Sequence, residues 1–191
     1  MRPIRLRDLR SWLFLAVLVG AASGCATPAQ VEQMVPVDVG IPEAPADSPF
    51  RGSINLGKVV GGEDPSPDMT YSTVGGQELE KALRASLHSY GYLSPETGAR
   101  FRLDVALIEL RRPRFGFTME GASFMRYKLV RVRDGETVYD EVIQVSATKT
   151  VQDEPVGVAR DRMLLEAIVR GNIARFLRTL HDRGADAKID R

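Results

Sequence analysis

Hydrophobic residues change their spacing several times along this chain of 191 residues, and each change marks a predicted element. Residues 53–60 are rich in apolar and β-branched side chains and are followed by two glycines, which predicts a first strand. From Gly76 onwards the apolar positions recur every three or four residues, as they do on one face of a helix. Gly91 can adopt the left-handed conformation that commonly ends a helix, so we expect the helix to stop there.

Three more strands are predicted further along the chain. Apolar and polar residues alternate over residues 100–112, which is the period of a half-buried strand. Residues 124–133 and 137–150 are expected to pair as a hairpin, because Asp134 and Gly135 between them favour the positive φ angles of a tight turn.

A final helix is predicted from apolar residues that recur on one face between Leu165 and Leu180. The expected order is therefore β-α-β-β-β-α. Two amphipathic helices that cover one face of a mainly antiparallel sheet form an α+β two-layer sandwich. We expect a single domain of this kind over residues 51–182, followed by a polar C-terminal tail over residues 183–191.

The first 25 residues follow a different pattern. Four arginines precede an apolar run over residues 11–22, and the run leads into Ser23, Gly24 and Cys25. A positive region, an apolar region and small residues before a cleavage site predict an export signal peptide over residues 1–24. A membrane-spanning helix is the competing interpretation, but a span needs roughly 20 apolar residues, and this run is shorter.

The end of this run resembles the lipobox of bacterial lipoproteins, although Ala22 stands where Leu is more frequent. The resemblance implies cleavage before Cys25, a diacylglycerol on its sulfur, and usually an acylated amino terminus. Ala26 stands where Asp would signal retention in the inner membrane. The resemblance therefore implies an outer-membrane lipoprotein whose domain faces the periplasm.

Residues 25–50 contain five prolines, and proline at this density is unfavourable for helices and central strands. We expect an extended tether that gives the domain reach from the membrane surface.

The charge balance and the absence of known motifs argue against several classes of function. Without residues 1–24 the chain has 22 basic and 24 acidic residues with interspersed signs, which argues against a nucleic-acid partner. The only cysteine would be lipidated, and the two histidines, His88 and His181, are far apart in the sequence. No nucleophile motif or cluster of metal-binding residues occurs. We expect a protein that is not an enzyme and has no catalytic residues, metal or cofactor.

One loop, residues 113–123, combines aromatic and cationic residues, both of which are enriched at contact surfaces. Arg112, Arg114, Phe115 and Phe117 are the candidate contacts with a partner or with lipid. The alternative is that the two phenylalanines fold back and cover an edge of the core, since large apolar groups are usually buried.

The lipobox, the proline-rich segment, the element order and the hairpin around Asp134 together resemble small outer-membrane lipoproteins of Gram-negative bacteria. The LPS-assembly lipoprotein and auxiliary lipoproteins of envelope transporters share this general plan. The resemblance implies a non-enzymatic adaptor or accessory subunit in envelope assembly or transport. Its partners would be the membrane, through Cys25, and an envelope protein complex. The alternative is a periplasmic module that binds a lipid or glycolipid between the sheet and the helices.

Overall fold

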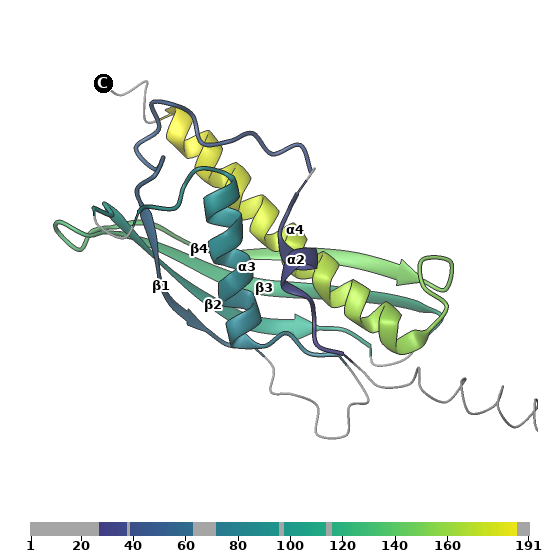
Figure 1. Cartoon of the computed structure of the whole chain (residues 1–191). Helices are drawn as coiled ribbons and strands as arrows, with labels where there is room; N and C mark the ends of the chain where they lie inside the picture. The colour runs from purple at the N-terminus through teal and green to yellow at the C-terminus, as the bar shows by residue number, and fades with distance from the viewer. Residues whose placement is uncertain (1–26, 38, 63–71, 96–97, 114–115, 187–191) are drawn as a thin grey trace, which may run out of the picture.

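The computed structural model describes residues 27–37, 39–62, 72–95, 98–113 and 116–186 (Figure 1). Within these residues, four strands form one sheet in the order β1-β2-β3-β4. The strands are β1 (Ile54–Val60), β2 (Phe101–Arg111), β3 (Thr118–Arg131) and β4 (Thr137–Thr150). The helices are α2 (Val31–Met34), α3 (Gly76–Ser89) and α4 (Gly157–Asp186).

The sheet is mainly antiparallel, and the helices lie on one of its faces (Figure 1). Strand β1 runs parallel to β2, because helix α3 carries the chain back between them, while β2, β3 and β4 form an antiparallel meander. The predicted α+β two-layer fold and its β-α-β-β-β-α order are confirmed.

Alternation along the strands builds the core. In β3, alternate residues from Met119 to Leu129 face the helices and are buried, and their neighbours face the open side of the sheet. The ring of Tyr127 stacks on that of Phe176 in α4, with centroids 4.1 Å apart and planes 9° apart. Buried side chains of both helices and the sheet belong to one continuous cluster.

The predicted boundaries need two adjustments. Strand β3 begins at Thr118, so residues 118–123 continue the sheet instead of forming a loop. Helix α4 continues to Asp186, into the predicted C-terminal tail, and Gly184 in this last part packs closely against Ser48. Gly135 has a φ of 74° in the turn after β3, as the hairpin prediction requires.

The proline-rich segment after Thr27 packs on the domain. Its buried apolar residues belong to the core: Ala29, Met34, Val35, Ile41 and Ala44. The Ala44 N–H donates to the Tyr90 carbonyl at 2.9 Å, and the short helix α2 contacts both α3 and α4.

The prediction of a free tether over residues 25–50 is therefore wrong where the structure describes this segment. Proline prevents regular pairing, but it does not prevent an irregular chain from burying apolar side chains against a helix pair. The Gln30 N–H donates to Glu166 Oε1 of α4 at 2.9 Å, so even the first residues of the segment are held. Burial of the Glu166 carboxyl raises its pKa.

No helix in the described part of the chain is both long and apolar enough to span a bilayer.

Candidate functional site

A pocket opens at the end of the sheet where β2 begins and β3 ends. It has a volume of about 540 Å³. The pairing of Phe101 with Arg131 places these two strand ends side by side. We call it the arginine pocket, and its lining residues are Pro49, Phe50, Ala99, Arg100, Phe101, Arg131, Val132, Arg133 and Val138.

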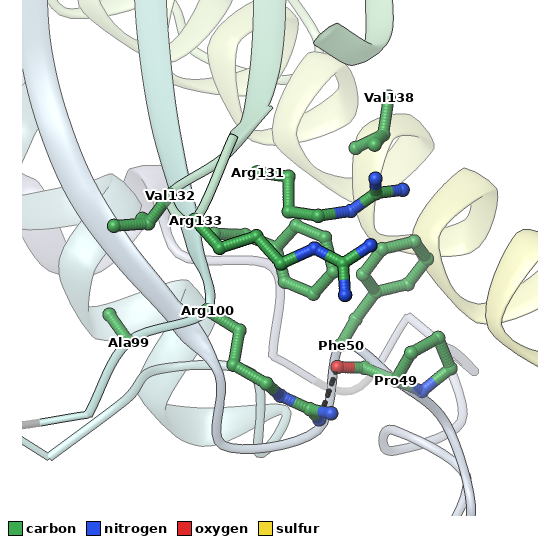
Figure 2. A pocket seen from close by; sticks show the side chains of 9 residues that line it. Pro49, Phe50, Ala99, Arg100, Arg131, Val132, Arg133 and Val138 are labelled. Atoms are coloured by element: carbon green, nitrogen blue, oxygen red, sulfur yellow. Dashed lines mark hydrogen bonds between the residues drawn. The ribbon is translucent and has the colours of Figure 1, made fainter. Parts of the chain in front are cut away.

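The floor of the arginine pocket is aromatic. Phe50 and Phe101 meet edge to face, with ring centroids 5.2 Å apart. Phe101 is the first residue of β2 and is buried, while Phe50 comes from the packed N-terminal segment. Figure 2 shows Arg131 and Arg133 extending toward Phe50, and Arg100 beside Pro49. The pocket therefore combines apolar surface with guanidinium groups.

Neighbouring groups hold these guanidinium groups in place. Arg100 Nη2 donates to the Pro49 carbonyl at 2.6 Å, and Arg131 Nη1 lies 2.5 Å from Glu136 Oε2. Arg131 and Arg133 also both contact Asp134 Oδ2, at 3.2 and 3.0 Å. Hydrogen bonds from Arg133, from the Glu136 N–H and from Arg131 lower the Asp134 pKa to about 2.

Two of the three arginines, Arg131 and Arg133, thus share the carboxylates of Asp134 and Glu136, while Arg100 is bound to the Pro49 carbonyl. Because most of the Arg133 side chain is exposed, its remaining N–H donors can reach an incoming acceptor. A guanidinium group matches a carboxylate or phosphate with two parallel hydrogen bonds. The pocket is suited to a ligand group that carries an anion next to an apolar moiety.

The opposite end of the sheet contains the residues that the sequence singled out. Arg112 directly follows β2, but its side chain is only 6% exposed. Its Nη1 lies 2.8 Å from Asp161 Oδ1, and its Nη2 donates to the Ser72 carbonyl at 2.8 Å. The expected partner contact at Arg112 is not what the structure shows, because this guanidinium group is engaged in an internal ion pair.

Phe117 lies at the same end and is 84% exposed, so it does not fold back over the core as the alternative required. Arg114, Phe115 and Cys25 lie outside the described residues. The two described candidates therefore differ: Arg112 forms a buried ion pair that holds the fold together, whereas the ring of Phe117 is exposed to solvent.

The arginine pocket was missed at the sequence level because its residues come from distant segments of the chain. One signal was available, since Arg131 and Arg133 both come just before the Asp134-Gly135 turn. In the described part of the chain, no group of three or more His, Cys, Asp or Glu side chains comes together as a metal site would require.

The fold defines a class: a four-stranded α+β domain with its helices on one face of the sheet. No family model and no curated protein matches this sequence. Among solved structures, a candidate lipoprotein from Caulobacter crescentus CB15 superposes with a TM-score of 0.50 at 17% identity, over 71% of this chain and 93% of its own. A DUF330 protein from Xanthomonas campestris gives 0.51 at 11% identity, over 78% and 93%. At these identities the likeness shows a shared fold.

Proposed function

We propose that this chain is a lipoprotein of the bacterial envelope, anchored through Cys25, that acts as a non-enzymatic adaptor. In this proposal it faces the periplasm from the outer membrane and binds a protein partner with the arginine pocket. The observation that carries the proposal is the position of the pocket. The pocket lies where β2 begins and β3 ends, whereas Thr27, the first described residue, binds Arg162 near the start of α4, which follows the far end of β4. In this proposal the pocket is therefore presented away from the anchor.

The chemistry of the pocket favours a peptide segment with an acidic residue next to an apolar one. The carboxylate would bind Arg133, and the apolar side chain would lie on Phe50 and Phe101. Arginine and aromatic residues are enriched among the residues that dominate the energy of protein interfaces. In this proposal the partner belongs to a complex of envelope assembly or transport, including one that assembles LPS.

The space between the sheet and the helices is filled by side chains, which supports the role of an adaptor rather than that of a lipid carrier. A lipid bound between these two layers would need the space that large side chains occupy. Tyr92, Tyr127 and Phe176 are fully buried there, together with leucines of α3 and α4. A glycolipid with an anionic head group could still use the surface pocket, so the experiment below includes it as an outcome.

Photo-crosslinking in the intact envelope tests the proposal. A photoreactive amino acid replaces Val132, which is 58% exposed in the pocket, or Val142, which is 53% exposed on the open face of the sheet. We expect a discrete protein adduct at position 132 and none at position 142. R133E should weaken the adduct at 132 about tenfold, because a charge-assisted hydrogen bond contributes about 1.5–3 kcal/mol.

R126E is the matched control, because Arg126 is an exposed arginine that pairs with Asp140 on the open face of the sheet. It should leave the adduct unchanged. A lipid or glycolipid adduct at position 132 would favour the binding module instead. Equal adducts at both positions, or an adduct that R133E does not weaken, would contradict the proposal.

A further inference from the structure

The first turn of α4 gathers distant segments of the chain at the end of the sheet opposite the arginine pocket. Arg160 is buried, and its Nη2 donates to the Gly116 carbonyl at 2.8 Å while its Nη1 donates to the Glu154 carbonyl at 2.5 Å. Two residues further on, Arg162 Nη1 donates to Thr27 Oγ1 at 2.5 Å. The beginning of the described chain therefore lies at the same end as the loops before β3 and before α4. We call this the anchor end: Thr27, residues 116–117, residues 154–156 and residues 160–162.

Two apolar side chains project from the anchor end. Phe117 is 84% exposed and Val156 is 48% exposed. Both follow residues whose carbonyls accept hydrogen bonds from Arg160, since Gly116 precedes Phe117 and Pro155 precedes Val156. One buried guanidinium group thus holds the two loops that carry these side chains.

Charged side chains near this end form ion pairs and hydrogen bonds within the domain. Asp161 binds Arg112, and Asp153 Oδ2 accepts the Thr150 N–H at 2.8 Å. Arg160 donates only to backbone carbonyls in the contacts described above. Phe117 and Val156 therefore project from the anchor end beside Arg160 and Asp161, both of which bind partners within the fold.

The length of chain before Thr27 limits what can cover this surface. Cys25 is two residues from Thr27, and two residues span at most about 7 Å. Thr27 itself is bound to α4, and the segment that follows it is packed on the domain. A lipid on Cys25 would therefore hold the anchor end against the membrane surface, with no long tether between them. This step rests on the proposed lipid anchor.

We propose that the anchor end lies on the lipid bilayer, with Phe117 and Val156 inserted at the interface between head groups and acyl chains. Aromatic and aliphatic side chains of peripheral proteins enter this region to bury apolar surface. The contact fixes the orientation of the domain. Strand β3 has 14 residues and spans roughly 45 Å, so the arginine pocket lies at most about that far from the membrane.

Spin labels on the lipidated full-length chain test this orientation. Cys25 is the only cysteine and its sulfur is blocked by the lipid, so F117C, V156C, V132C and V142C each give one labelling site. Each protein is reconstituted into vesicles of phosphatidylethanolamine and phosphatidylglycerol. Accessibility is then measured to oxygen, which concentrates in the bilayer, and to a water-soluble nickel chelate.

Labels at positions 117 and 156 should show a several-fold higher ratio of oxygen to nickel accessibility than labels at positions 132 and 142 in the same vesicles. If the chain carries its lipid and binds the vesicles but positions 117 and 156 stay as accessible to nickel as position 132, the orientation is wrong while the proposed anchor stands. If Cys25 carries no lipid, both proposals fail.

Discussion

Replacing Arg112 with Met is expected to lower the free energy of unfolding by about 3–5 kcal/mol, which is the usual cost of leaving one buried charge without its partner. Asp161 is only 3% exposed at the side chain, and its Oδ2 also accepts the Ser72 N–H at 3.0 Å. Removal of the guanidinium group would leave this carboxylate of α4 buried without its ion-pair partner. Urea denaturation followed by circular dichroism measures the loss.

Arg111 provides the matched control for this prediction. It precedes Arg112 directly, but it is exposed and pairs with Glu109 on the surface. R111M should cost less than about 1 kcal/mol, as is usual for surface ion pairs. The double variant R112M/D161L should recover part of the lost stability, because an apolar pair can replace a buried ion pair but leaves the Ser72 N–H and carbonyl without these partners. Equal effects of R111M and R112M would contradict a structural role for Arg112.

Replacing Asn172 with Leu is the second substitution with a large expected effect, a loss of about 3 kcal/mol or more. The fully buried Asn172 side chain joins α4 to both antiparallel strands of the hairpin. Its Nδ2 donates to the Ile143 carbonyl at 2.9 Å and to Ser123 Oγ at 3.0 Å, and its Oδ1 accepts the Tyr127 hydroxyl at 3.1 Å. Leucine would leave several buried polar groups without partners, each at a cost of about 1–3 kcal/mol.

Two further variants distinguish the contribution of these hydrogen bonds from the general effect of replacing a polar side chain. Y127F removes one of the hydrogen bonds and should cost only about 1 kcal/mol. Asn55 lies exposed on the edge strand β1, and N55L should change stability by less than about 0.5 kcal/mol. If N172L unfolds at the same denaturant concentration as N55L, the hydrogen-bond network around Asn172 contributes little to stability.

Local patterns accounted for the element order of this fold. Alternation over residues 101–107 and the Asp134-Gly135 turn encode a strand and a hairpin within a few residues, so periodicity and turn chemistry were sufficient to predict them. The packing of residues 27–50 was not predicted, because the prolines indicated only an irregular backbone. Met34 and Ile41, apolar residues among those prolines, were the available signal for burial.

Long-range pairing explains what the sequence could not show about the sites. Arg112 and Asp161 are 49 residues apart, and no local pattern distinguishes a buried arginine from the exposed Arg111 beside it. The arginine pocket likewise needs Phe50, Phe101 and Arg133 from three separate segments. Phe117 was predicted as a possible contact because of its residue type, and its exposure at the anchor end could be found only in the folded structure.

The mass of the mature N-terminus tests the central claim most directly, because the anchor, the orientation and the presentation of the arginine pocket all depend on Cys25. The full-length chain is expressed in a Gram-negative host and the protein from the membrane fraction is analysed intact and after proteolysis. We predict a chain that begins at Cys25 and carries a diacylglycerol and an N-terminal acyl chain, and a C25S variant that is not processed. A chain that retains residues 1–24, or a mature chain with a free thiol at Cys25, would contradict the account.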